Sequence, residues 1–328
     1  VERDRFDYSS AIAESWKRMM LLNVVKIRYG DTPIFLEVSS VVNQYSREQE
    51  IRAVAGLTSG DLLGDGLELG GAGTYYDRPT ITYNPLSGEK FAKSLLAPIP
   101  PHAIFTLVQS GWNVDFIFRV CLSAINDLFN TSKRQQIYRQ ADQGFNELLE
   151  SLSSIQQAGG LGSRLVKRKG SETIVFFRRQ QDDRFRQELS RVLNLLGLQD
   201  DTLEYKLVYG STPANDTEIA MLTRSMLDII GELSHYIEIP THHIKENRAS
   251  PGSHEEDSTI DDEQQVIIHS SKQKPEDAFI AIEYRDYWFF IDDTDFESKR
   301  IFSFLLFLFT LAESGPAGLA PILTIPAG

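Results

Sequence analysis

The most apolar stretch of the chain lies near its C-terminal end and predicts a buried helix. From Ile301 to Ala312 the polar residues are Ser303 and Thr310, so we expect a helix here to be enclosed on nearly all sides. The run is well short of the roughly 20 residues that a helix needs to cross a bilayer. Thr294 and Glu297 have the Thr-x-x-Glu spacing of a capping box and are expected to begin the helix.

Apolar residues also recur at helical spacing in several other segments. We expect helices over residues 8–29, 101–111, 113–128, 137–155, 182–196 and 215–237. Asn113 and Asp182 or Asp183 are expected to cap two of them, and Asn215 with Glu218 a third. Together they predict a helical block over about 88–158 and further helices beyond it.

A strand pattern dominates residues 34–83. Residues 34–46 are rich in β-branched side chains, and the apolar residues of the second half share one parity against polar neighbours. Asp65-Gly66 is a favourable two-residue turn between the two halves. The segment therefore predicts one long β-hairpin, with arms that approach 20 residues, or about 60 Å each. Its glycines lack the Gly-Lys-Ser/Thr ending of a phosphate-binding loop, so the hairpin interpretation is favoured.

Shorter strand patterns appear at 164–178, 203–209, 266–269, 278–284, 287–291 and 322–325. The fold class that follows is α+β, with antiparallel β-hairpins, a helical block, a buried C-terminal helix and the long glycine-rich hairpin. We expect a single domain over 1–328, with a subdivision into 1–160 and 161–328 as the alternative. The polar, acidic segment 245–265 is expected to be a mobile loop.

Composition narrows the function classes. The net charge of −13 argues against broad nucleic-acid binding, which requires a basic surface. Cys121 is the one cysteine of the chain, which excludes an intrachain disulfide and a cysteine-based zinc site. Because Cys121 lies in the apolar stripe of a predicted helix, we interpret it as a small buried side chain and not a nucleophile. No cofactor is predicted.

Three polar groups are candidates for a binding site. Asp292, Asp293 and Asp295 form a carboxylate cluster that could hold a divalent cation, although helix capping explains it equally simply. The adjacent His242 and His243 are interpreted as part of a surface loop, because neighbouring residues of an extended segment point to opposite faces. A basic patch on the 164–178 hairpin is a candidate contact for an anionic ligand or lipid headgroup, through Arg164, Lys167, Arg168 and Lys169.

Six sequence blocks are informative when taken together: Asp7–Lys17, Leu21–Pro33, Val38–Ser46, Asp77–Phe91, Thr223–Leu227 and Tyr287–Asp293. They resemble a family of uncharacterised Gram-negative proteins that are predicted to be envelope lipoproteins. The resemblance implies export to the periplasm or outer membrane and a lipid anchor attached upstream of Val1. It implies no catalytic residues.

We therefore expect a non-enzymatic cell-envelope protein that acts by assembly or partner binding through the hairpin. Long strand edges are usually paired or covered, so the partner is expected to be a second copy or another envelope protein. The interface residues expected from the pattern are Tyr45, Leu67, Leu69, Tyr75, Tyr76, Ile81 and Tyr83. Two alternatives stay open: a metal-dependent enzyme or binder that uses the aspartate cluster, and a lipid- or glycan-binding periplasmic protein.

Overall fold

The computed structural model describes residues 2–54, 68–85, 87–132, 139–167, 171–178, 182–249, 266–313 and 322–324. The chain divides into two compact units. Unit 1 contains residues 1–33 and 87–314, and unit 2 contains residues 34–86 and 315–328. The fold class is α+β, as predicted. The division falls at the two ends of the long hairpin and not near residue 160.

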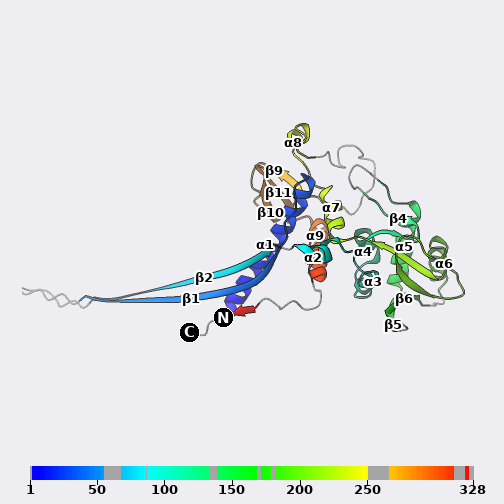
Figure 1. Ribbon diagram of the computed structural model, residues 1–328, viewed down its shortest axis with the longest axis horizontal. Helices are drawn as coiled ribbons and strands as arrows, with labels where there is room; N and C mark the ends of the chain where they lie inside the picture. Colours follow the sequence, from blue (N-terminus) through cyan, green and yellow to red (C-terminus); the bar gives the residue numbers. More distant parts are fainter. Residues whose placement is uncertain are drawn as a thin grey trace, which may run out of the picture. The chain divides into compact units, whose positions relative to one another are not determined.

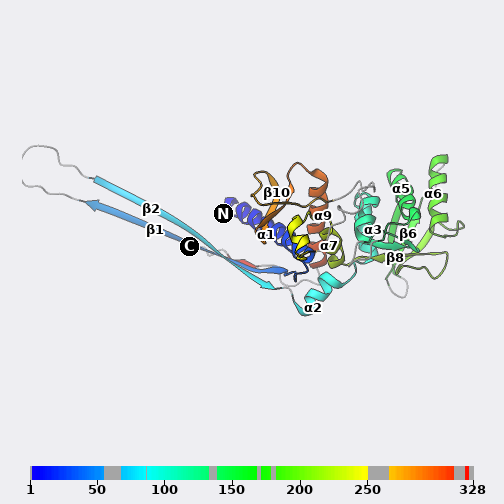
Figure 2. The ribbon, with the colours of Figure 1, turned by 90° about the horizontal axis from the view of Figure 1, so that it is seen from above.

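Unit 2 is a three-stranded sheet in the order β12-β1-β2. Strands β1 (Leu36–Val54) and β2 (Glu68–Pro85) are antiparallel and lie side by side along their length (Figures 1 and 2). Strand β12 (Ile322–Thr324) is parallel to β1. The long hairpin is confirmed, while its predicted Asp65-Gly66 turn lies outside the described residues.

The larger sheet of unit 1 has six strands in the order β4-β3-β8-β7-β6-β5. These are β3 (Leu122–Ile125), β4 (Leu128–Phe129), β5 (Leu161–Lys167), β6 (Ser171–Phe177), β7 (Glu204–Tyr209) and β8 (Glu218–Thr223). Helices α3 and α5 contact this sheet, and α4 and α6 pack against them. Their bounds are α3 (Pro101–Gln109), α4 (Val114–Cys121), α5 (Gln143–Gln157) and α6 (Asp183–Leu195).

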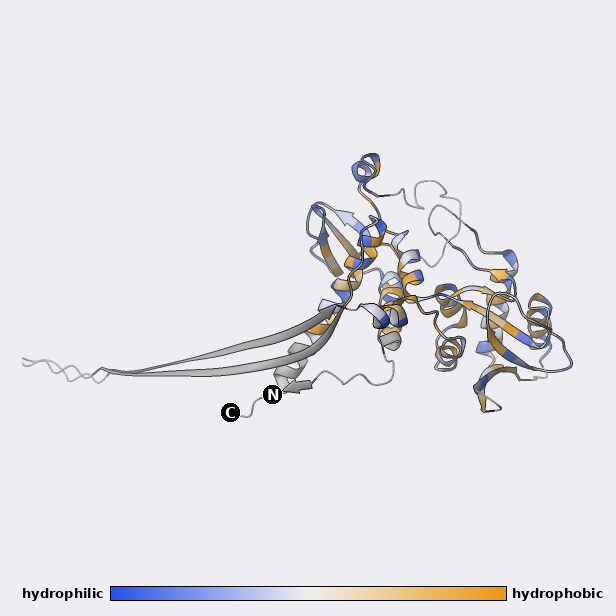
Figure 3. Cartoon of the chain, viewed as in Figure 1, coloured by the Kyte–Doolittle hydropathy of each residue, from blue (hydrophilic) through white to orange (hydrophobic). Residues whose placement is uncertain are grey.

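A smaller sheet of unit 1 has the order β10-β11-β9 and packs against helix α1 through β10. Its strands are β9 (His269–Ser271), β10 (Ala278–Tyr284) and β11 (Tyr287–Asp292). The other helical segments are α1 (Glu2–Arg28), α2 (Gly88–Phe91), the π-helical η1 (Ala92–Leu96), α7 (Met226–Ser234), α8 (Thr241–Lys245) and α9 (Phe296–Glu313). Helix α1 contacts β10, α7 and α9. The coloured helices of unit 1 carry both hydrophobic and hydrophilic residues (Figure 3), as expected where one face is buried.

The predicted helix over 113–128 is wrong in its second half. Asn113 caps α4 as expected, with its side chain accepting hydrogen bonds from two backbone N–H groups. The helix ends at Cys121, however, and the chain continues as β3. Asn126 and Asp127 both have positive φ, of 43° and 63°, and form the two-residue turn between β3 and β4. The apolar residues on both sides of this Asn-Asp pair recur at helical spacing, so the sequence pattern predicted a continuous helix and not a turn.

The predicted cap at Asn215 and Glu218 is also wrong. Glu218 begins β8, which pairs with β3 and β7 in the middle of the large sheet. The following helix, α7, begins after Ser225, whose hydroxyl accepts from the backbone N–H of Asp228. The Asp228 carboxylate accepts in return from the Ser225 N–H. This capping box, and not the earlier pair, opens the helix.

Helix α9 is largely buried, as predicted, but two details differ. Its first turn is capped by Asp295, whose carboxylate accepts from the backbone N–H of Ser298, so the Thr294 and Glu297 box is wrong by one residue. The helix also has an open face, because Phe307 is 41% exposed. Of the helices in the described part of the chain, none is long and apolar enough to cross a membrane.

Candidate functional site

The long hairpin is the first candidate site, because its edges are open. Strands β1 and β2 contain 19 and 18 residues, which corresponds to about 60 Å at roughly 3.3 Å per residue. Pairing is continuous from Leu36 opposite Pro85 to Val54 opposite Glu68, with one irregularity between Val38 and Ser40. Such strands are more than twice as long as typical strands of globular proteins.

The outer edge of β1 is paired only near its base. Strand β12 covers the three positions Ser40, Val41 and Val42. Among the described residues, no strand pairs with the rest of that edge or with the outer edge of β2. An unpaired edge presents a row of backbone N–H and C=O groups to any chain that can add a strand. The hairpin therefore offers two long edges for pairing.

The register places the predicted interface residues along this ribbon. Their partners are Tyr45 with Asp77, Leu69 with Ala53, Tyr75 with Arg47, Tyr76 with Ser46, Ile81 with Val41 and Tyr83 with Val38. Positions 45, 69, 75, 81 and 83 belong to one face of the ribbon and position 76 to the other. Leu67 lies outside the described residues.

The glycines among the described hairpin residues lie in β2, near its distal end. Gly70, Gly71 and Gly73 are paired with Arg52, Ile51 and Gln49 of β1. Glycine in a strand leaves the backbone open to close approach by another chain, although it weakens an isolated strand. These glycines therefore favour a strand that is stabilised by pairing with another chain.

The structure describes two of the four residues of the predicted basic patch. Arg164 lies in β5 and donates to Glu204 of β7, with 2.5 Å between Nη2 and Oε2. Both side chains are about half exposed, at 54% and 52%. Lys167 ends β5, and Arg168 and Lys169 lie outside the described residues. Arg164 thus already has an anionic partner, and an exposed pair of this kind contributes little to stability.

The three aspartates before α9 each have a partner in the same turn or in the start of α9. Asp292 accepts hydrogen bonds from the backbone N–H and the hydroxyl of Thr294, and these bonds hold the pKa of its carboxyl below the ordinary value. Asp293 pairs with Lys299 at 2.8 Å, while Asp295 caps the helix. Among the described residues, no three His, Cys, Asp or Glu side chains are grouped to hold a metal ion.

The histidine pair is not in a surface loop, and that interpretation is wrong for His243. Both histidines lie in α8, where His242 is exposed and His243 is only 2% exposed. The hydroxyl of Tyr29, at the end of α1, lies 2.7 Å from Nδ1 of His243. The ring of Tyr287 from β11 lies 5.4 Å from each histidine ring. Sequence reasoning missed this cluster because its members come from three distant segments.

A network at the β10–β11 turn adjoins this cluster. Tyr284 donates a hydrogen bond to Asp31, and Nη2 of Arg285 donates to the same carboxylate at 2.8 Å. The hydrogen bond from Tyr284, followed by that from Arg285, lowers the pKa of Asp31. The Arg285 guanidinium also lies 5.0 Å from the centre of the Tyr29 ring. The end of α1 is thus bound to the turn by charge and by ring contacts.

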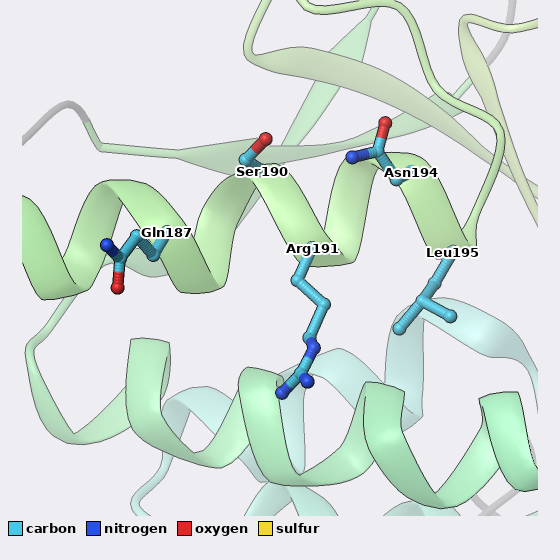
Figure 4. A pocket seen from close by; sticks show the side chains of 5 residues that line it. All are labelled: Gln187, Ser190, Arg191, Asn194 and Leu195. Carbon is cyan, nitrogen blue, oxygen red and sulfur yellow. The ribbon is translucent and has the colours of Figure 1, made fainter.

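Two further features are a buried thiol and a surface hollow. Cys121 is fully buried, and burial raises the pKa of its thiol to about 12, so it lacks the thiolate that a nucleophile requires. A shallow hollow of about 500 Å³ lies along α6, lined by Gln187, Ser190, Arg191, Asn194 and Leu195 (Figure 4). These lining residues include no histidine or carboxylate that could activate Ser190.

Comparison with known proteins adds no functional information: no family model, curated protein or solved structure matches the chain.

Proposed function

We propose that this chain is a non-enzymatic cell-envelope protein that assembles with further copies of itself through the β1–β2 hairpin. The observation that carries the proposal is the pair of long strands with open outer edges in the described part of unit 2. The envelope location is supported by the resemblance of the sequence blocks, since the hairpin itself is neutral on location.

Backbone pairing favours assembly because an isolated two-stranded hairpin is at best marginally stable in water. Here 18 paired positions extend over the hairpin, and β12 adds a third strand at three of them. A neighbouring β2 edge placed beside β1 would supply the missing backbone partners over the remaining length. The glycine positions of β2 would let that neighbour approach closely.

The first test is the size of the purified full-length chain, measured by light scattering with and without detergent. We expect an oligomer in at least one of these conditions. Protein taken from its native envelope provides the most direct sample. A monomer in every condition would contradict self-association.

The second test locates the interface by disulfide crosslinking. One variant carries Ser46→Cys in β1 and another carries Thr74→Cys in β2, and the two purified variants are mixed under oxidising conditions. Each chain has one accessible thiol, because native Cys121 is buried, so a disulfide between the variants requires β1 of one copy beside β2 of another. Neighbouring positions on both strands are scanned to allow for the unknown register between copies. Absence of crosslinks across the whole scan would refute hairpin pairing.

The third test removes the distal hairpin while keeping its base in register. Residues 50–74 are deleted, and Glu48→Asn with Gln49→Gly supplies a two-residue turn between the paired Arg47 and Tyr75. The matched control carries these two substitutions in the full-length chain. We expect the deletion to abolish association and the control to retain it. Unchanged association of the deletion variant would place the interface elsewhere.

A further inference from the structure

A feature of unit 1 that is separate from the hairpin lies where the end of α1, helix α8 and the β10–β11 turn meet. His243 is the one buried residue among the five of α8. Its side chain contacts the Tyr29 hydroxyl at 2.7 Å and the Tyr29 ring, which lies edge-on at 5.6 Å between centres. The Tyr287 ring also lies edge-on to it, at 5.4 Å. Because the other residues of this short helix are more exposed, its attachment depends largely on His243.

The hydrogen bond fixes the protonation state of the pair. Burial raises the pKa of Tyr29 to about 12, so the hydroxyl keeps its hydrogen at ordinary pH and donates it. Nδ1 of His243 then accepts, which requires a neutral imidazole with its own hydrogen on Nε2. A second hydrogen on Nδ1 would meet the hydroxyl hydrogen and break this arrangement.

The surroundings of His243 disfavour a positive charge. The charged and titratable groups that face it are His242, Glu246 and Arg248 from α8 and the residues after it, Tyr29 from α1, and Arg285 and Tyr287 from the turn. Glu246 already pairs with Arg248 at 2.6 Å, and Asp31 is bound by Arg285. Burial, and then the electrostatic interactions with His242 and Arg248, lower the pKa of His243.

We propose that Tyr29 and His243 form an acid-sensitive latch, in which protonation of His243 releases α8 from α1 and the β10–β11 turn. Release removes the charged imidazole from its buried site to water, where the charge is solvated. The proton equilibrium therefore couples to docking of one short helix and leaves the rest of unit 1 folded. This latch is independent of assembly through the hairpin.

The test is amide hydrogen exchange of the full-length chain at about pH 7.5 and about pH 5, on either side of the ordinary histidine pKa. Rates are corrected for the intrinsic effect of pH on exchange. We expect residues 241–248 to lose protection at the acidic pH while α5 keeps it. Equal protection of 241–248 at both pH values would overturn the latch.

Variants separate the charge from the hydrogen bond. His243→Asn places a neutral acceptor near the position of Nδ1 and should make protection of α8 independent of pH. His102→Asn, at an exposed histidine of α3, is the matched control and should behave as the unmodified chain. Tyr29→Phe keeps the ring but removes the hydroxyl, and should lower the protection of α8 already at about pH 7.5. Unchanged protection in Tyr29→Phe, or a retained pH effect in His243→Asn, would refute the proposal.

Discussion

Asn126 provides the most stringent test of the large sheet of unit 1. This residue is 7% exposed and has a φ of 43° in the turn between β3 and β4. Its side-chain amide donates to the carbonyls of Leu196 and Glu218, at 2.7 and 3.2 Å, and its carbonyl oxygen accepts from the Ala220 N–H at 2.7 Å. One side chain thus satisfies three backbone groups from two other segments.

Replacement of this side chain should lower the free energy of unfolding. Asn126→Ala removes three hydrogen bonds at about 1 kcal/mol each and places a Cβ-bearing residue without local hydrogen bonds in a left-handed conformation, at about 1 kcal/mol more. The expected loss in the free energy of unfolding is therefore about 4 kcal/mol. Asn126→Gly avoids most of the backbone term, so we expect about 3 kcal/mol. The two variants separate side-chain from backbone effects.

The assay is chemical denaturation followed by tryptophan fluorescence. Trp16, Trp112 and Trp288 are the three tryptophans of the chain and all belong to unit 1, so the signal reports on this unit. Asp127→Gly is the matched control, since Asp127 has the same left-handed backbone (φ 63°) but an exposed side chain. We expect the control to change stability by less than about 1 kcal/mol. A loss below about 1 kcal/mol for Asn126→Ala would refute the role of this residue.

Three further outcomes follow. Ser225→Ala should destabilise unit 1 by about 1 kcal/mol in the same assay, because it removes half of the capping box with Asp228; an unchanged denaturation midpoint would contradict this. The pKa of His243 is lowered from 6.5, so the unfolded chain binds a proton that the folded chain does not, and the contribution to stability is complete above about pH 6.5 and declines as the pH falls below it. The unmodified chain should therefore lose stability relative to His243→Asn on acidification, and parallel pH profiles would count against this. Cys121 should react with a thiol reagent only after denaturation, because it is fully buried; fast labelling of the native chain would show the packing to be different.

Local sequence signals are sufficient to predict an element whose first and last residues are marked by a cap or a glycine. Helix α6 begins after Asp182, whose side chain accepts from the Arg184 N–H, and is followed by Gly197 with a φ of 61°. Both features are readable in the sequence, since a cap and a left-handed glycine act within one turn of the helix. The long hairpin was likewise predictable, because alternation over so many residues has no helical counterpart.

The central strand β8 was not predictable from the same pattern, although its neighbour β7 was. Ile219, Ala220 and Met221 of β8 are consecutive and all buried, at 2%, 0% and 0% exposure. Such a strand is covered on both faces and shows no alternation, so an apolar run of this kind reads equally well as a helix. Only pairing with β3 and β7 decided the outcome.

The functional features likewise divide into those that local sequence predicts and those that depend on tertiary structure. The sequence by itself determined the hairpin and its candidate interface positions, because strand periodicity and turn residues are local properties. The Tyr29–His243 contact joins residues 214 positions apart, and nothing in either neighbourhood indicates the other. The buried state of His243 depends on which segments the fold brings around it. That was decided by the tertiary structure alone, since burial and charge environment are properties of the packed chain.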